Sequence, residues 1–351
     1  MHPRLRPVLL LAVLLAPVPV GACRGGRGAI ELTGRARPVR ADDGTELTAY
    51  ELLVKGPAPI PPPRGWLFYL QGSERRSASS AAERLAGAAQ LGLRPVLLER
   101  RGVSPDGSVD EALARAASSK AQRVADHRRV IESWLEGAEP QAPVILVGAS
   151  EGGDVAARVA AQLQQAPQGP HVTHLVLIDA GGGWCQADEL RFLLRTRGAL
   201  LGLTRAEDLE AAFQRIRREP DALTLWAGHP HRRWSTFLWD RPLDDLLALE
   251  VPVFLAQGDR DESVPVESAR AVVEAFRAQG RTNLAYKEYA GFGHGLVRAS
   301  DGVSGFPLLE ADLLAWFAGQ GALSAAEAEA AAARVRRAHP GLFPPAAGVA
   351  R

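Results

Sequence analysis

A single serine stands on a glycine-rich turn in the stretch LVGASEGGDV, which contains Gly148-Ala149-Ser150-Glu151-Gly152. The apolar run at 143–148 predicts a buried strand before this turn, and the amphipathic run after it predicts a helix. Small flanking residues permit a sharp, strained turn that lifts the serine hydroxyl above the sheet edge. A hydroxyl in that position is typical of a nucleophile that attacks a carbonyl carbon. The structural alternative is an ordinary strand-to-helix loop capped by serine.

A histidine must accompany the serine, because a serine hydroxyl is a weak nucleophile near neutral pH without a base. On such a turn the three groups follow the chain order serine, acid, histidine. His294, in YAGFGHGLV, follows the last predicted strand and lies between Gly293 and Gly295. His339 also lies late in the chain, but directly before Pro340 on a predicted terminal helix. We therefore predict that His294 is the base; the alternative is an exposed loop histidine.

Three carboxylates follow a buried strand in VPVFLAQGDRDESVP: Asp259, Asp261 and Glu262. Asp261 is the predicted acid that orients the histidine. Asp259, one residue after the strand, is the main rival and is expected to bind the turn backbone instead. Asp179, at the end of HLVLID, is a weaker competitor. Any of these carboxylates could instead cap the next helix, which is predicted to begin near Glu267.

An oxyanion that forms during attack needs two backbone amides aimed at it. The amide of Glu151, directly after the nucleophile, is one predicted donor. The loop QGSERR after the strand at 65–70 supplies the other: Gly72 allows close approach and Ser73 donates its N–H. The Glu151 side chain is not needed for this role, and we expect its carboxylate to cover the helix start.

The elements that position these residues alternate between strands and helices. The stretch at 31–54 predicts a hairpin around Asp42-Asp43-Gly44. Helices are predicted within 80–92, 121–137 and 267–280. Short apolar runs predict buried strands at 65–70, 94–99, 143–148, 174–179, 252–258 and 283–289. This order favours an α/β fold, with a mostly parallel central sheet flanked by helices and entered through an antiparallel hairpin.

The interval at about 181–249 has no clear strand and is too long for a simple connection, so it predicts a helical layer of its own. Four tryptophans lie in it: Trp184, Trp226, Trp234 and Trp239. They either pack this layer onto the sheet or line a substrate pocket, and different rings can do either.

The motifs LVGASEGG, AQGDRDESVP and AGFGHGL, in that order, resemble the α/β-hydrolase family over about residues 30–320. YLQGS is similar to the family's oxyanion loop, with Gln71 where a histidine is frequent. FLWDRPLDDLLALEVPVFLAQGDRD is similar to the segment before the acid in peptidase-like and dienelactone-hydrolase-like members. The resemblance implies a helical cap at about 181–249 and cleavage of an ester, thioester or amide through an acyl-enzyme on Ser150. Water activated by His294 would release the acyl group.

The N-terminus predicts export, since Arg4 and Arg6 precede an apolar run at 7–20 that ends in small residues. This run is shorter than the roughly 18–20 residues of a membrane span. VGAC resembles the bacterial lipoprotein cleavage box, so we predict lipidation of Cys23 and a place in the cell envelope. Plain cleavage near Ala22, with release to the periplasm, and an uncleaved anchor are the alternatives.

The domain layout expected from these patterns is an export signal at 1–22, a linker at 23–29, a hydrolase domain at 30–320, and a terminal helix and tail at 321–351. Ser324 and Glu327 have capping-box spacing at the start of that helix.

The charge balance and the cysteine count argue against several classes of function. With 41 basic and 40 acidic residues the net charge is +1, which gives no reason to expect a nucleic-acid partner. The two cysteines, Cys23 and Cys185, predict neither a disulfide framework nor a metal cluster. We expect a monomer that needs no cofactor and acts on a small ester or amide. A non-catalytic binding lipoprotein and an acyltransferase or cofactor-free haloperoxidase-like enzyme are the competing functions.

Overall fold

The structure is a computed structural model that describes residues 32–54, 63–138, 142–166 and 169–343. The predicted export signal at 1–22, the linker at 23–29 and the lipidation candidate Cys23 lie outside the described residues. Among the described residues, no helix combines the length and the apolar character that a bilayer crossing requires.

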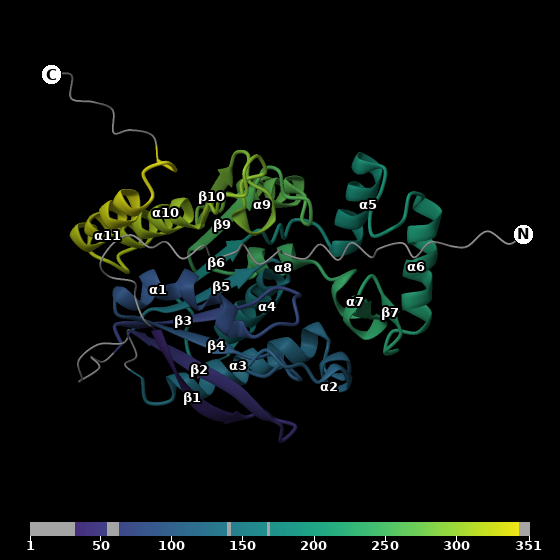
Figure 1. The fold of residues 1–351 in the computed structure, drawn as a ribbon, viewed down its shortest axis with the longest axis horizontal. Helices are drawn as coiled ribbons and strands as arrows, with labels where there is room; N and C mark the ends of the chain where they lie inside the picture. Colours follow the sequence, from purple (N-terminus) through teal and green to yellow (C-terminus); the bar gives the residue numbers. More distant parts are fainter. Residues whose placement is uncertain (1–31, 55–62, 139–141, 167–168, 344–351) are drawn as a thin grey trace, which may run out of the picture.

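One eight-stranded sheet forms the centre of the molecule (Figure 1). Its strand order is β1-β2-β4-β3-β5-β6-β9-β10. The pairs from β4 to β10 are all parallel, whereas β1–β2 and β2–β4 are antiparallel. The sheet strands are β1 Leu32–Arg40, β2 Glu46–Val54, β3 Gly65–Leu70, β4 Leu93–Leu98, β5 Val144–Ala149, β6 His174–Ile178, β9 Val253–Gly258 and β10 Leu284–Tyr289.

The predicted strands and the entry hairpin are confirmed, and so is the parallel sheet. The central strands are buried apart from the half-buried Trp66 of β3 and Ala149 of β5, as expected where helices cover both faces of a parallel sheet. Successive side chains of one strand point to opposite faces. On β3, Phe68 and Leu70 belong to one buried cluster, while Leu67 and Tyr69 belong to the other.

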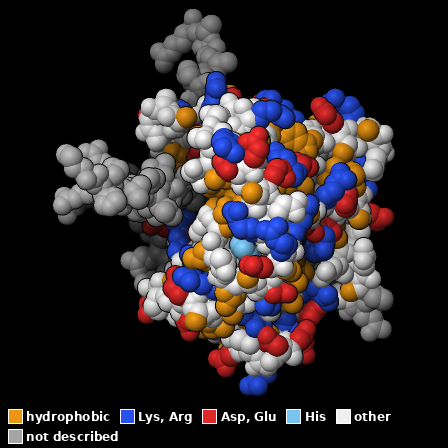
Figure 2. Space-filling view, turned by 90° about the vertical axis from the view of Figure 1, so that its right-hand side faces the viewer, with side chains coloured by type: hydrophobic (Ala, Val, Ile, Leu, Met, Phe, Trp, Pro, Cys, Tyr) orange, Lys and Arg blue, Asp and Glu red, His pale blue; other side chains and the backbone are white. Residues whose placement is uncertain are grey.

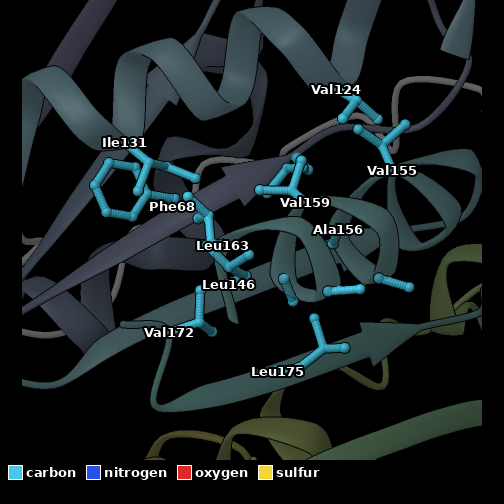
Figure 3. Close-up of a cluster of buried hydrophobic side chains, with 14 of the residues drawn as sticks. Phe68, Val124, Ile131, Leu146, Val155, Ala156, Val159, Leu163, Val172 and Leu175 are labelled. Atoms are coloured by element: carbon cyan, nitrogen blue, oxygen red, sulfur yellow. The ribbon is translucent and has the colours of Figure 1, made fainter. Parts of the chain in front are cut away.

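Helices cover both faces of this sheet. Helices α3, α4, α8 and α9 contribute to the cluster that contains Phe68. Figure 3 shows part of it, with Val124 and Ile131 of α3 above Phe68 of β3 and Leu146 of β5. Helices α1, α10 and α11 contribute to the opposite cluster. The bounds are α1 Ala82–Gln90, α2 Glu111–Ala116, α3 Lys120–Leu135, α4 Glu151–Gln165, α8 Pro242–Ala248, α9 Val266–Ala278, α10 Phe306–Gly319 and α11 Ala325–Ala338, with short 3₁₀ turns η1 Ala78–Ala81 and η2 His294–Leu296.

A separate helical layer lies beside the sheet, where Figure 1 shows α5, α6 and α7 at one end of the molecule. These helices span Gln186–Arg197, Ala206–Arg218 and His231–Phe237. This layer, called the cap below, is the predicted helical insertion. Helix α8, which also falls within the predicted interval, packs into the main core instead.

The cap has a small core of its own, in which aromatic rings pack together. The rings of Trp226 and Trp234 lie 4.7 Å apart, and Trp239 lies edge-on to Phe213 at 6.3 Å. Trp184 packs against a phenylalanine of α5. Trp226, Trp234 and Trp239 thus pack within the cap itself, whereas packing onto the sheet or the lining of a pocket was expected from the sequence.

A small hairpin in the cap differs from the sequence expectation that this interval lacks a clear strand. Strands β7 Leu225–Trp226 and β8 His229–Pro230 pair across Ala227 and Gly228, both with positive φ. Two residues per strand are too few to show the alternation by which strands are identified in a sequence.

The C-terminal helix α11 begins with the predicted capping box. The Ser324 hydroxyl accepts from the Glu327 amide at 3.3 Å, and the Glu327 carboxylate accepts from the Ser324 amide at 3.1 Å. This helix packs on α10, which adds buried leucines to the core.

Candidate active site

The turn between β5 and α4 holds Ser150 in a strained conformation. Its φ of 52° and ψ of −130° lie where residues other than glycine are rarely found. Two glycines make this turn possible. A Cβ on Gly148 would lie 2.5 Å from the Gly152 carbonyl oxygen, and a Cβ on Gly152 would overlap the Leu70 carbonyl oxygen of β3. The sequence motif therefore marks close backbone approaches that only glycine allows.

Replacing Gly152 with alanine is expected to unfold or severely destabilise this part of the chain, because the new methyl group meets fixed backbone of β3 rather than a movable side chain. Thermal unfolding monitored by circular dichroism should show a midpoint at least about 10 °C lower, from a loss of several kcal/mol. Gly319→Ala is the matched control, since nothing lies within 4 Å of a Cβ there. Equal midpoints for the two variants would contradict the overlap.

The three predicted side chains lie in hydrogen-bond contact. His294 Nε2 is 3.1 Å from Ser150 Oγ, and His294 Nδ1 is 2.9 Å from Asp261 Oδ2 and 3.1 Å from Oδ1. With the Nδ1 hydrogen donated to Asp261, Nε2 is free to accept the serine proton. His294 comes from the loop after β10 and Asp261 from the loop after β9, so strands at one sheet edge bring the three together.

Asp261 is held in place by hydrogen bonds in addition to its contact with His294. Its carboxylate is buried and accepts hydrogen bonds from the amides of Ser263 and Val264, at 2.8 and 2.9 Å, and from the Gln257 side chain at 2.8 Å. These donors fix the direction of the carboxylate. The loop therefore presents one defined acceptor to His294.

The two rival carboxylates have other partners. Asp259 accepts from the Gly291 amide at 2.6 Å, the turn-binding role expected for it. Asp179 ends β6 with a positive φ of 48° and accepts from the amides of Gly258 and Leu296, each at 2.9 Å. Asp179 thus connects the acid loop to the histidine loop without a hydrogen bond to the imidazole itself.

Burial and charge set the proton affinities of this cluster. Burial alone would lower the pKa of His294, but the charge and hydrogen bond of Asp261 outweigh it and raise that pKa from 6.5 to about 9. Burial, followed by the nearby Asp261 charge, raises the pKa of Asp179 from 3.8 to about 7. The two carboxylates therefore differ in effect: Asp261 raises the proton affinity of the imidazole, whereas Asp179 itself accepts a proton near neutral pH.

The two predicted oxyanion donors lie at the start of α4 and in the loop after β3. Glu151 is the first residue of α4, and the helix leaves its amide without an internal partner. The loop after β3 passes close to the nucleophile, since a Cβ on Gly72 would lie 3.3 Å from Ser150 Cβ. Ser73 is the next residue of that loop.

The Glu151 side chain differs from the expectation that it would cover the helix start. It is buried and pairs with Arg123 of α3 and Arg233 of α7, with Arg100 3.9 Å away. No pattern in the sequence pointed to this cluster, because its members lie in four segments whose spacing follows no motif.

The cap also contacts the loop after β9 that carries Asp261, called the acid loop. Arg197 at the end of α5 donates to the carbonyl oxygens of Asp261 and Glu262, at 3.0 Å to Asp261. Figure 2 shows the face on which the cap lies, where Lys and Arg side chains gather around a histidine near the middle. The cap thus contacts both the nucleophile turn and the acid loop.

Metal-type ligand atoms of Asp179, Asp261 and His294 lie within 4.8 Å of one another. Each of these atoms is already engaged: Asp179 by two amides, and Asp261 and His294 by each other. Within the described residues this is the one such group. Its hydrogen bonds are those of an imidazole that a carboxylate orients as a base.

Comparisons with known proteins give matches in structure only. No protein-family model matches the chain, and no curated protein matches it in sequence. A puromycin hydrolase is 20% identical with a TM-score of 0.53, over 83% of this chain and 40% of that one. This chain therefore spans less than half of that protein's length.

Two esterases match over almost their whole length. Est1E from Butyrivibrio proteoclasticus is 18% identical with a TM-score of 0.56, covering 83% of this chain and all of the esterase. An esterase from Pyrococcus furiosus is 14% identical with a TM-score of 0.55, covering 84% of this chain and 95% of the esterase. Together with the strand order and the strained serine turn, these likenesses show that the chain has the α/β-hydrolase fold.

Proposed function

We propose that this protein is a serine hydrolase that cleaves an ester, thioester or amide through an acyl-enzyme on Ser150. The observation that carries the proposal is the continuous contact from Ser150 Oγ through the His294 imidazole to the Asp261 carboxylate. The esterase and hydrolase structures of similar fold support this proposal.

In the proposed reaction, His294 Nε2 takes the proton of Ser150 Oγ as that oxygen bonds to the carbonyl carbon of the substrate. The amides of Glu151 and Ser73 stabilise the negative oxygen of the tetrahedral intermediate. His294 then gives the proton to the leaving group as its bond to carbon breaks. Water, deprotonated by the same imidazole, releases the acyl group and restores the serine.

The direct test is covalent labelling of the folded protein with a fluorophosphonate probe, followed by peptide mass spectrometry. Labelling at Ser150 is the expected result, because the probe reports a serine activated by a neighbouring base. Absence of labelling in folded protein would contradict the proposal and favour a binding role. Acyl transfer to an added alcohol that outcompetes water would identify an acyltransferase instead.

The proposed substrate carries a medium-sized apolar acyl or aromatic group, a preference inferred from the tryptophans and leucines in the sequence of the cap interval. A series of p-nitrophenyl esters of increasing chain length, with charged peptides alongside, tests this. A preference for medium-length or aromatic acyl groups is expected, and a preference for charged peptides would overturn it.

The activity is expected to rise steeply with pH, because His294 must lose its proton before it can accept one from Ser150. With its pKa raised to about 9, kcat/KM of the free enzyme should increase about tenfold per pH unit below that value and level off above it. Initial rates between pH 6 and 10 measure this profile, with the Ser150→Ala protein as the blank for spontaneous hydrolysis. A plateau already reached at pH 7 would contradict a raised pKa.

We also propose that the protein is exported and lipid-modified at Cys23, from the sequence pattern around it. Expression in a bacterial host with radiolabelled palmitate should label the wild-type chain and not Cys23→Ser. Cys185→Ser is the matched control and should label fully. A soluble, unlabelled wild-type chain that begins after Ala22 would favour plain cleavage.

A further inference from the structure

The carboxylate directly after the nucleophile is buried among three arginines. Glu151 accepts from Arg123 Nη1 at 2.6 Å and from Arg233 Nε at 2.7 Å, with a second contact from Arg233 Nη2. Arg100 Nη1 lies 3.9 Å away. The Glu151 side chain is 2% exposed, and those of Arg123 and Arg233 are 6% exposed. We call these four residues the arginine–glutamate cluster.

This cluster carries an excess of positive charge on buried side chains. Burial alone would raise the pKa of Glu151, but Arg233, Arg123 and Arg100 hold it well below its usual range. Burial and the neighbouring Arg123 lower the pKa of Arg100 to about 10. The nitrogens Arg123 Nε and Arg233 Nη1 are buried and have no hydrogen-bond partner. Burial of a net charge costs desolvation free energy, so such a cluster contributes little to the stability of the fold.

The same arginines also hold the other side of the oxyanion site. Arg123 Nη2 donates to the Gln71 carbonyl oxygen, and Arg100 Nη1 donates to the Gly72 carbonyl oxygen at 3.3 Å. Gly72 passes so close to the nucleophile that a Cβ on it would lie 3.3 Å from Ser150 Cβ. Glu151 and the loop after β3 are therefore tied to one set of guanidinium groups.

One member of the cluster belongs to the cap. Arg233 lies on α7, where its guanidinium group sits 3.9 Å from the centre of the Trp234 ring and 4.9 Å from that of Phe237. These rings fix the guanidinium plane within the cap. The contact with Glu151 thus joins the position of the cap to the position of the turn that carries the nucleophile.

We propose that the arginine–glutamate cluster positions the two oxyanion amides around Ser150, and that Arg233 makes this arrangement depend on a seated cap. The proposal rests on the proposed function, since it assigns a positioning role within that site. Its physical basis is that oxyanion stabilisation requires donors fixed in advance, and a displacement of about 1 Å can reduce a rate on the order of 100-fold.

The test compares kcat and KM of Glu151→Gln and Arg233→Met with those of the wild type on one p-nitrophenyl ester. A fall in kcat on the order of 10- to 100-fold, with KM changed less than about threefold, is expected for each variant. The double variant should be little worse than Glu151→Gln, because both substitutions break the same link. Arg233→Lys should regain part of kcat, since it keeps the charge without the bidentate contact.

Arg158→Met is the matched control. Arg158 also lies on α4, but its ion-pair partners are Asp245 at 2.7 Å and Asp240 at 3.0 Å, neither of which belongs to the arginine–glutamate cluster. This variant should keep the wild-type kcat. If Glu151→Gln does not fold, the kcat of Arg233→Met alone tests the proposal. That variant is expected to fold, because Glu151 keeps its Arg123 partner in it.

Two results would overturn the proposal. A higher kcat in Glu151→Gln would mean that the added net positive charge, and not the positioning, governs the rate. Unchanged kcat in folded variants with a lowered unfolding temperature would mean that the cluster is only structural. Fluorophosphonate labelling of the wild type separates these failures from a failure of the proposed function: no labelling of the wild type contradicts both, whereas equal labelling rates of wild type and Glu151→Gln contradict the cluster alone.

Discussion

The Ser150→Ala protein is expected to hydrolyse esters about 10⁴- to 10⁶-fold more slowly than the wild type, because the oxygen that forms the acyl-enzyme is gone. What remains is the contribution of substrate binding and of the oxyanion amides. The measurement is kcat on the best ester of the chain-length series, together with loss of fluorophosphonate labelling.

The fold should survive this substitution, since the Ser150 hydroxyl contacts His294 and the turn itself is shaped by its glycines. Circular dichroism and the unfolding temperature should therefore match the wild type closely. Ser300→Ala, at an exposed position, is the matched control and should keep full activity. Hydrolysis by Ser150→Ala at even a tenth of the wild-type rate would place the chemistry elsewhere.

Replacement of Asp261 with asparagine should reduce kcat by about 10⁴, the second-largest expected effect. The asparagine oxygen is expected to keep the hydrogen bonds from the Ser263 and Val264 amides, which places its NH2 group against His294 Nδ1. Since NH2 donates, the imidazole is then held in the wrong tautomer. Because Asp261 also raises the pKa of His294, the remaining activity should reach its plateau at a lower pH than in the wild type. That shift of the pH profile is a readout that a purely structural role would not produce.

Comparison with Asp179→Asn distinguishes the role of Asp179 from that of Asp261. Asp179 accepts from the amides of Gly258 and Leu296, and an asparagine can satisfy only one of them with its oxygen. The expected result is a loss of about 1–3 kcal/mol in stability with a far smaller loss of kcat than in Asp261→Asn. The reverse ranking of kcat would show that Asp179 is the orienting acid.

The local parts of the site were predictable from the sequence. A glycine-flanked serine between a strand and a helix requires only neighbouring residues, and the structure shows it as the turn with φ of 52° at Ser150. The strands were found because their apolar runs are continuous, and the capping box at Ser324 because it depends on a spacing of three residues. Helices α5, α6 and α7 form a layer within the long interval for which helices were predicted.

Very short strands and contacts between distant segments were not predictable from the sequence. The hairpin of β7 and β8 has too few residues to show a period. The location of α8 in the main core, rather than in the cap, depends on which surface its leucines meet. Periodicity shows that a helix has an apolar face but does not show what covers that face.

By itself the sequence determined the order of strands and helices and the three side chains suited to acyl transfer, because these depend on local spacing and residue type. Only the tertiary structure decided which acid faces His294. All three carboxylates accept backbone amides, but Asp261 alone among them also has an oxygen, Oδ2, within 2.9 Å of His294 Nδ1. It also decided where the Glu151 carboxylate goes, since Arg100, Arg123 and Arg233 reach it from separate segments. Hydrogen bonds and charge act over distances of a few ångströms, and the distance between segments is set by how the sheet and cap pack, not by their separation along the chain.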